Sequence, residues 1–558
     1  MEETGATEVT PRPCAAPARL LAVRYTLAML SRVQSYVLQG IDAVACEVEV
    51  DFTEHEETGD PPRPIIVGLP DTGVKESLER VKSALMNTGY EAPRGRLVVN
   101  LAPADVRKEG PVYDLPIALG ILAAQGVIKM PAARPRGDLD GPRDAPHDGL
   151  DFRTLVIAGE LALDGRLRPI KGALALAALA KQRGAKGVMV PADNAPEAAV
   201  VPDLPIYGVR TLAEVVGILT GSLEAVPASP PDIATLLATA QAPVDFGEVR
   251  GQEAVKRAIV IAAAGGHNLL MLGPPGTGKT MMAKALPGVL PPLSPEEAVE
   301  ITRIWSAAGQ LPPGTSLVTT RPVRTPHHTA STPAIVGGGA VPRPGEISLA
   351  HRGVLFLDEL PEFQRDALEA LRQPLEDHVV TVARAHAAVK FPASFMLVAA
   401  MNPTPKGDMP VGEIGKRAME RYMERLSGPL LDRIDIHVEA PAVPFAVLAA
   451  ARPGMSSTAM REQVHAARRV QNARQGALTP NARLSGKQLN ELAPMAQDAQ
   501  AMLGHAMTEL GLSARAYDKI RRVARTIADM ESKDGADAPI LVHHVAEAIG
   551  YRLLDRKI

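Results

Sequence analysis

The chain has 558 residues, enough for three or four domains, and its 46 % hydrophobic content is typical of a globular protein with sizeable cores. A net charge of −3 and only 3 % aromatic residues exclude a protein that is basic overall and argue against base-stacking platforms, so any contact with nucleic acid must come from local basic loops. Two cysteines, Cys14 and Cys46, exclude a four-cysteine zinc site and indicate a reducing, cytoplasmic compartment, and the lack of a run of about 18 apolar residues predicts no membrane-spanning helix.

The first half of the chain is predicted to hold one α/β domain. Residues 1–28 are rich in Pro, Ala and Thr and are interpreted as a disordered extension, because a signal peptide needs a basic start and an apolar core. Residues 29–225 alternate strand-like apolar runs with helical spacing. Within them, residues 131–150 are dense in Pro, Gly and Asp and indicate a flexible surface insertion, and residues 226–244 are interpreted as a linker.

A phosphate-binding loop of the pattern G-x-x-x-x-G-K-[ST] follows the apolar run 269–272. The loop consists of Gly273, Pro274, Pro275, Gly276, Thr277, Gly278, Lys279 and Thr280. Its glycines let backbone N–H groups close around phosphate oxygens, Lys279 reaches the β- and γ-phosphates, and the Thr280 hydroxyl can bind Mg²⁺. The helix expected after the loop adds the positive end of its dipole. This motif predicts an ATP site.

A second motif lies about 80 residues further on, where the apolar run 354–357 ends in Asp358 and Glu359. A hydrophobic strand that delivers carboxylates to its C-terminal end places them beside the phosphates of an open α/β sheet. Asp358 is expected to hold Mg²⁺, and Glu359 to orient the attacking water. The motifs assign residues 245–445 to a P-loop α/β domain, and the purely helical periodicity of residues 446–558 predicts an α-helical lid.

Several longer strings carry a family resemblance. They are residues 68–71 (GLPD), 100–105 (NLAPAD), 251–252 (GQ), 324–328 (RTPHH), 427–435 (SGPLLDRID) and 512–517 (LSARAY). Through them the chain resembles the magnesium-chelatase-like AAA+ ATPases, in particular the ComM (YifB) family, over nearly everything after Met29. The resemblance also makes Met29 the expected start, which would leave residues 1–28 as a mis-annotated or dispensable tail. It implies a ring-forming motor that hydrolyses ATP between subunits.

The resemblance also assigns roles to single residues. Arg433 is the expected arginine finger, with an ion pair to Asp432 or Asp435 as the open alternative and Arg425 as the second candidate. Asn402, at the end of a strand, resembles the sensor that positions the lytic water with Glu359; the alternative is a turn cap.

In the lid, Arg515 resembles the second sensor, which reads the γ-phosphate of its own subunit; the alternative is a solvated arginine. Gln252 resembles an adenine contact.

Two basic segments interrupt the nucleotide core and resemble pore-facing insertions. Residues 321–345 are rich in Gly and Pro, and residues 381–390 indicate a hairpin. Basic groups on such loops suit phosphate contact without base reading, whereas packing between subunits is the alternative. A metal site at His327 and His328 is disfavoured, because no third ligand has suitable spacing. The candidate DNA contacts are Arg321, Arg324, Arg343, Arg384 and Lys390.

The N-terminal domain resembles the S5-type α/β proteolytic domain of Lon in residues 108–120 and 159–194. Lon uses a serine activated by a lysine, and nucleophilic catalysis needs both. Here Val112 stands at the serine position and Leu174 at the lysine position, and Lys171 is offset by three residues. A protease is therefore not expected.

The expected function is a hexameric, ATP- and Mg²⁺-dependent DNA motor, a branch-migration helicase that acts on single-stranded and branched DNA in homologous recombination and natural transformation. A metal-insertion ATPase of the magnesium chelatase type is one alternative. A protein-remodelling chaperone is another, although its pore loops would normally carry aromatic residues, which residues 321–345 lack.

Overall fold

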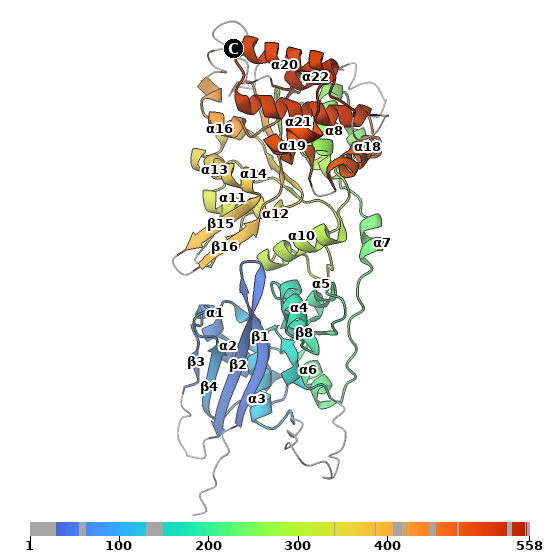
Figure 1. Cartoon of the computed structure of the whole chain (residues 1–558). Helices are drawn as coiled ribbons and strands as arrows, with labels where there is room; N and C mark the ends of the chain where they lie inside the picture. Colours follow the sequence, from blue (N-terminus) through green and yellow to red (C-terminus); the bar gives the residue numbers. More distant parts are fainter. Residues whose placement is uncertain are drawn as a thin grey trace, which may run out of the picture.

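The computed structural model places two α/β halves end to end, with a helical region beyond the second (Figure 1). The residues that it describes are 29–54, 63–129, 149–339, 341–384, 387–404, 417, 419, 421–445, 454–476, 479–532, 538–552 and 554. The predicted extension 1–28 and nearly all of the predicted insertion 131–150 lie outside these residues. In the part of the chain that the structure describes, every helix is too short or too polar to cross a membrane.

A seven-stranded mixed sheet forms the first half, in the order β3-β4-β2-β1-β5-β8-β9. The strands are β1 (Met29–Gln39), β2 (Asp42–Glu54), β3 (Ile65–Val67), β4 (Gly95–Ala102), β5 (Leu155–Ile157), β8 (Gly187–Pro191) and β9 (Ile206–Val209). β1 and β2 form a long antiparallel hairpin with Gln39 opposite Asp42 at its tip, whereas β1, β5, β8 and β9 run parallel. Leu97, Val99 and Leu101 alternate toward the core along β4, as the period of a strand requires.

Helices cover this sheet and fill its core. They are α1 (Thr72–Lys75), α2 (Ser77–Asn87), α3 (Asp114–Ala124), α4 (Ala173–Gln182), α5 (Ala195–Ala198) and α6 (Leu212–Thr220), and a short ribbon joins β6 (Glu160–Leu161) to β7 (Leu167–Arg168). Every residue of α3 is buried, and it packs against β1 and β2. Gly120 permits this approach, because a Cβ there would lie 2.4 Å from Val50. The segment interpreted as a linker contains a helix, α7 (Ile233–Ala238), because Asp232 caps its first turn.

The second half holds a five-stranded parallel sheet in the order β11-β14-β17-β10-β18. The strands are β10 (Leu269–Leu272), β11 (Val323–Arg324), β14 (Val354–Leu357), β17 (Met396–Met401) and β18 (Ile436–Glu439). Nearly every strand residue of β10, β14 and β17 is buried, since helices cover both faces of a parallel sheet. The predicted hairpin at residues 381–390 is confirmed as β15 (Val379–Arg384) and β16 (Ala387–Pro392).

The helices of this half follow the strands or connect them. They are α8 (Glu253–Gly265), α9 (Lys279–Ala285), α10 (Pro295–Ala308), α11 (Thr332–Val336), α12 (Glu346–Leu349), α13 (Arg365–Ala370), α14 (Arg372–Asp377) and α16 (Gly428–Leu431), with a small ribbon of β12 (Gly337–Gly338) and β13 (Arg343–Pro344).

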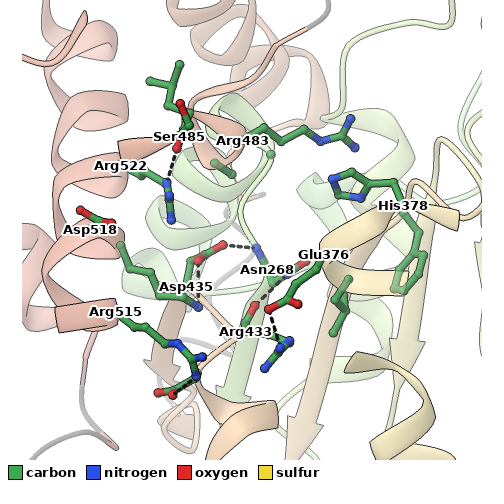
Figure 2. Close-up of a pocket in the computed structure, with 17 residues that line it drawn as sticks. Asn268, Glu376, His378, Arg433, Asp435, Arg483, Ser485, Arg515, Asp518 and Arg522 are labelled. Atoms are coloured by element: carbon green, nitrogen blue, oxygen red, sulfur yellow. Dashed lines mark hydrogen bonds and ion pairs between the residues drawn. The ribbon is translucent and has the colours of Figure 1, made fainter. Parts of the chain in front are cut away.

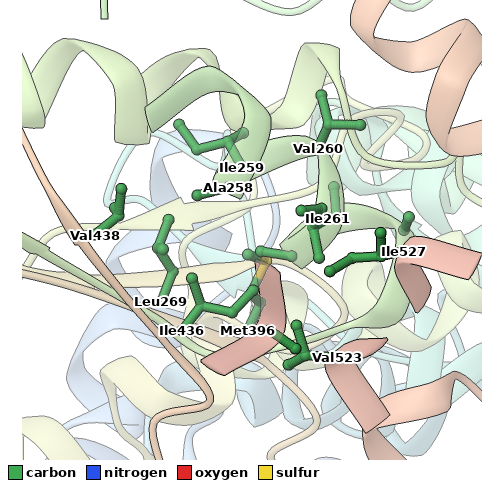
Figure 3. Packing of buried hydrophobic residues seen from close by; sticks show 14 of the residues in the cluster. Ala258, Ile259, Val260, Ile261, Leu269, Met396, Ile436, Val438, Val523 and Ile527 are labelled. Atoms are coloured by element: carbon green, nitrogen blue, oxygen red, sulfur yellow. The ribbon is translucent and has the colours of Figure 1, made fainter. Parts of the chain in front are cut away.

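The C-terminal region is helical, as expected. Its helices are α18 (Ser457–Gln475), α19 (Gly486–Leu492), α20 (Gln497–Glu509), α21 (Ala514–Glu531) and α22 (Val542–Gly550). The chain between α19 and α20 is not helical, because Pro494 cannot donate the backbone hydrogen bond that a helix needs. Figure 3 shows Val523 and Ile527 of α21 in one core with Val260 and Ile261 of α8, so this region shares the core of the sheet.

The two halves meet at α10, which lies between them in Figure 1. Leu174 of α4 and Ile301 of α10 share a small apolar cluster. Gly172 N donates to the Ser306 carbonyl at 3.2 Å, and Arg303 pairs with Asp42 at the tip of the β1–β2 hairpin. The structure therefore joins the halves by apolar packing as well as by polar contacts.

Candidate nucleotide site

The phosphate-binding loop leaves the carboxyl end of β10 in a conformation that only glycine adopts without strain. Gly276 and Gly278 have φ of +80° and +86°, and a Cβ added at either position would meet no neighbouring atom within 4 Å. A Cβ on Gly273 would lie 2.1 Å from the Ala440 carbonyl oxygen. The loop's backbone is therefore held close to the segment that follows β18.

The Lys279 side chain folds back over this loop. It is 7 % exposed, and its Nζ donates to the carbonyls of Gly273 and Pro274 at 2.7 and 2.8 Å and to Asn402 Oδ1 at 3.3 Å. Burial lowers the pKa of Lys279, while the Asp358 and Glu359 carboxylates act in the opposite direction. Lys279 and Asn402 thus meet although 123 residues separate them.

Thr280, Asp358 and Glu359 form the neighbouring cluster. Thr280 Oγ1 donates to Asp358 Oδ2 at 2.7 Å, and Glu359 N donates to Asp358 Oδ1 at 3.0 Å. Glu359 has φ of +54°, and this left-handed turn directs its half-exposed carboxylate away from the strand. Hydroxyl and carboxylate oxygens are the donors that Mg²⁺ prefers, so Thr280 and Asp358 fit this ion. Because β17 lies between β10 and β14, the three strand ends converge at one edge.

His328 is a contact that the sequence analysis missed. Its Nδ1 lies 3.3 Å from Glu359 Oε2, its ring stacks on His327 with centroids 4.2 Å apart, and Phe363 meets it edge-on. His328 therefore contacts the Glu359 carboxylate directly, whereas the sequence analysis considered the two histidines only as a disfavoured metal site. No sequence signal linked His328 to Glu359, because the contact spans 31 positions that include α11, α12 and β14.

Gln252 lies beside the loop. It caps α8 from a left-handed conformation with φ of +61°, and its Nε2 donates to the Pro441 carbonyl at 2.7 Å and the Thr277 carbonyl at 3.4 Å. Its amide thus ties α8 to the loop and to the segment after β18, near the position predicted for adenine.

Arg433 and Arg515 lie at the opposite edge of the same sheet. Both line a cavity of about 430 Å³ together with Asn268, the residue before β10 (Figure 2). Asn268 Nδ2 donates to the Arg433 carbonyl at 2.9 Å. The four residues of β10 separate Asn268 from Gly273, and five steps of extended strand correspond to about 16 Å. The role of Arg515 as the reader of its own subunit's γ-phosphate stays a prediction.

Each of these arginines has a carboxylate partner. Arg433 pairs with Glu376 of α14 and donates to the Pro429 carbonyl at 2.5 Å, so its partner is neither Asp432 nor Asp435. Arg515 is 67 % exposed, and its Nη1 lies 3.4 Å from Asp432 Oδ2. Figure 2 shows Arg433 beside Glu376, and Arg515, among the side chains that line the cavity.

Asp435 anchors the floor of this cavity. Burial alone would raise its pKa, but Lys519 at 3.1 Å and His267 at 3.7 Å outweigh burial and hold that pKa well below its usual range. Asn268 N also donates to its carboxylate at 3.1 Å. The segment that carries Arg433 is thereby fixed to α21 and to β10.

Arg425, the second finger candidate, lies at the carboxyl edge instead. Its Nη1 is 2.9 Å from both oxygens of Glu362, three residues beyond Glu359, and its guanidinium covers the Tyr422 ring at 5.6 Å. Burial, followed by the charge of Glu362, raises the pKa of Tyr422 to about 12.

The candidate DNA contacts divide into two groups. The structure contradicts the expectation that Arg321 is a DNA contact. Its side chain is 13 % exposed and donates to the carbonyls of Pro291 and Arg352 and to Glu297, so it cannot turn outward without breaking buried bonds. Arg324 donates to both oxygens of Glu346 at 2.6 and 2.8 Å.

Two other candidates are free of such networks. Arg343 is 67 % exposed, with Glu109 at 3.7 Å, and Lys390 is exposed on β16. The Arg384 side chain lies outside the described residues.

Another cavity lies between the first half and residues 341–343 of the second half. Val112 and Lys171 line this space of about 310 Å³, whereas Leu174 is buried in the cluster with α10. Burial, followed by the charge of Arg343, lowers the pKa of Lys171. With valine at the serine position, the described part of this cavity offers no hydroxyl at that place.

Comparison with known families matches most of the chain. The model described as magnesium chelatase, subunit ChlI, matches residues 245–448, and its C-terminal counterpart matches residues 454–552. A third model, subunit ChlI of Mg-chelatase, matches residues 48–135 and 145–194.

Three curated proteins illustrate the range of similarity. Competence protein ComM of Haemophilus influenzae is 42 % identical over 94 % of this chain and 98 % of its own length. The uncharacterized protein YifB of Escherichia coli is 42 % identical over the same shares. The magnesium-chelatase 38 kDa subunit of Rhodobacter capsulatus is 28 % identical over 29 % of this chain and 51 % of its own length.

Proposed function

Because the chain belongs to the magnesium chelatase ChlI family of AAA+ proteins, in its ComM/YifB branch, we propose that it is an ATP- and Mg²⁺-dependent motor that acts on DNA. The observation that carries the proposal is a pair of hydrogen bonds at the carboxyl edge of the parallel sheet, one from Lys279 to Asn402 and one from Thr280 to Asp358. We place the protein in the cytoplasm.

The residues divide the work as follows. The loop amides and Lys279 hold the phosphates of ATP, and Lys279 exchanges its bonds to the Gly273 and Pro274 carbonyls for phosphate oxygens. Thr280 and Asp358 hold Mg²⁺, which when bound neutralises charge on the phosphates. Glu359 orients the attacking water together with Asn402, and its carboxylate is positioned by His328.

The far edge of the sheet supports action between subunits. Arg433 and Arg515 both line the cavity beside Asn268, which precedes β10, whereas the phosphate-binding loop follows the carboxyl end of that strand. We infer that Arg433 serves the nucleotide of the adjacent subunit in a closed ring, for which a hexamer is the proposed size. A ring places the loops that carry Arg343, Arg384 and Lys390 where a DNA strand can pass.

Branch migration in homologous recombination and natural transformation is the finer proposal, and the relative named competence protein ComM supports it. The proposed units are residues 29–225, a Lon-like domain without protease activity; 226–244, a linker; 245–445, the ATPase core; and 446–558, the lid. A metal-insertion role is less well supported, since the magnesium-chelatase subunit aligns with only 29 % of the chain.

The test is steady-state ATP hydrolysis with Mg²⁺, measured alone and with single-stranded, duplex and four-way-junction DNA. We expect DNA to stimulate hydrolysis, four-way junctions to stimulate it most, and Glu359→Gln to abolish it. Hydrolysis that is indifferent to every DNA at low salt contradicts the DNA motor and favours a chelatase-like or protein-remodelling role.

A further inference from the structure

A second cavity, of about 460 Å³, lies between the amino edge of the parallel sheet, the start of α10 and helix α18. Four arginines from distant parts of the sequence line it: Arg321, Arg352, Arg468 and Arg483. It adjoins the cavity of Arg433, and Arg483 lines both; Figure 2 shows Arg483 beside His378 at that border. The nucleotide site at the other edge of the sheet makes no use of these arginines.

Carboxylates balance only half of this charge. Arg321 Nη2 lies 2.8 Å from Glu297, and Arg352 Nε lies 3.1 Å from Glu300. His465 lines the same cavity and supplies no negative charge. Burial lowers the pKa of His465, so its ring is neutral at pH 7. Two guanidiniums, those of Arg468 and Arg483, have no carboxylate within ion-pair distance among the described residues.

Arg468 and Arg483 are also short of hydrogen-bond partners. Arg468 donates to the Ala263 carbonyl at 3.3 Å, and its Nε is buried without a partner among the described residues. Arg483 donates to Ser394 Oγ. Burial, followed by the charges of Arg321 and Arg483, lowers the pKa of Arg468 to about 10, so it stays charged at neutral pH. Arg483 is exposed to the cavity, whereas Arg468 is half-buried and its Nε is shielded from solvent. A cation removed from water without a counter-ion is costly, which indicates a site that an anion completes.

We propose that this cavity binds a phosphate-bearing anion through the Arg468 and Arg483 guanidiniums, with Arg352 at its rim. Planar guanidinium forks match the oxygens of phosphate, and the volume suits one or two phosphate groups. The phosphate comes from a free polyphosphate or from the phosphodiester backbone of a nucleic acid. The site is separate from the ATP loop and does not rest on the proposed motor function.

The test uses pyrophosphate on the full chain with Lys279→Ala, which disables the ATP loop. We expect pyrophosphate to raise the Tm of this variant in sulfate- and phosphate-free buffer. Adding Arg468→Gln weakens pyrophosphate binding by about tenfold or more in calorimetric titration, because a charge-assisted bond is lost. Arg469→Gln is the matched control, since it removes the same charge from an exposed position of α18.

A second variant separates binding from folding. Arg483→Gln is expected to weaken pyrophosphate binding in the same way as Arg468→Gln. Without pyrophosphate, Arg468→Gln leaves the Tm unchanged or raises it, because one of several repelling cations is removed. No pyrophosphate stabilisation of the Lys279→Ala chain, or equal weakening by Arg469→Gln and Arg468→Gln, overturns the proposal.

Labelled single-stranded DNA distinguishes the two phosphate sources. If Arg468→Gln also weakens DNA binding in fluorescence anisotropy, relative to Arg469→Gln, the phosphate belongs to a nucleic acid backbone. If pyrophosphate binding falls while DNA binding does not, the ligand is a free polyphosphate. Either result supports the proposed phosphate site, provided that Arg468→Gln weakens pyrophosphate binding.

Discussion

The two edges of the five-stranded sheet are built from the same strands and hold opposite kinds of chemistry. At the carboxyl edge, Lys279 bonds to Asn402 and Thr280 bonds to Asp358 beside a glycine-rich loop. At the amino edge, arginines outnumber their partners and face two cavities that lack a phosphate-binding loop. One edge is a complete set of groups for a nucleotide, whereas the other has cations that need an anion from elsewhere.

The difference follows from how each edge is assembled. Residues that come directly after parallel strands must meet at the carboxyl edge. The amino edge instead collects side chains from helices and loops, such as Arg433 beside Asn268 and Arg515 at the start of α21. A motor whose sites lie between subunits needs both kinds of edge, and substitutions can tell them apart.

The largest effect is expected for Arg433→Ala. Loss of an arginine finger lowers kcat of ATP hydrolysis by about 10³–10⁵ while nucleotide binding is kept. Mixing this variant with Lys279→Ala should restore part of the activity, because an intact loop then meets an intact arginine across an interface. ATPase assays of the mixture check this; no recovery at any ratio contradicts action between subunits.

Glu359→Gln tests the catalytic carboxylate at the carboxyl edge of the sheet. We expect kcat to fall by about 10²–10⁴, the range for loss of a general base, with ATP affinity nearly unchanged. Glu362→Gln is the control, since Glu362 lies in the same turn but pairs with Arg425. Equal losses in both variants would assign the effect to the turn and not to the Glu359 carboxylate.

Glu376→Gln tests whether the ion pair with Glu376 restrains the Arg433 guanidinium at the amino edge of the sheet. Because Glu376 binds the Arg433 guanidinium from a 59 % exposed position, its removal frees the arginine at small cost. We expect kcat to rise by up to about fivefold, equivalent to an exposed ion pair of about 1 kcal/mol. Glu369→Gln, which breaks a neighbouring pair with Arg372, should leave kcat unchanged. A fall in kcat would make Glu376 a positioning group for Arg433.

The smallest effect concerns stability against pH at the border of the two cavities. Burial, followed by the charges of Arg483 and Arg352, lowers the pKa of His378 to about 4. The unfolded chain therefore binds the proton first, and stability falls as the pH drops from about 6.5 to about 4.

His378→Asn, which suits the left-handed backbone there, should remove roughly 1 kcal/mol of this loss, allowing for partial exposure to solvent. Urea denaturation at several pH values measures it. An unchanged pH profile would show that His378 does not titrate in this window.

Much of the fold could be predicted from local patterns. The apolar runs at residues 269–272 and 354–357 are strands, and the pattern of residues 381–390 is a hairpin. The helical periodicity of residues 446–558 is confirmed as α18 to α22, with a break at Pro494 between α19 and α20. Residues 226–244 form α7 in part because Asp232 supplies a cap that a Pro-rich composition obscures.

Some residues of the candidate site could also be named from the sequence, whereas others could not. Lys279, Thr280, Asp358 and Glu359 could be named because each stands at the end of a strand pattern or in a motif. The contact of His328 with Glu359 and the pair of Arg433 with Glu376 could not, since nothing in the spacing of these residues brings them together. Arg321 looked like a free basic group, and only its buried hydrogen bonds show otherwise.

By itself the sequence determined the strands, the phosphate-binding loop, the acidic strand end and the family, because these depend on short-range order and on periodicity. The tertiary structure alone decided which edge of the sheet receives Arg433 and Arg515, and it gathered four arginines around one cavity. The physical reason is that such placements depend on how helices pack over the sheet, through contacts between residues tens to hundreds of positions apart.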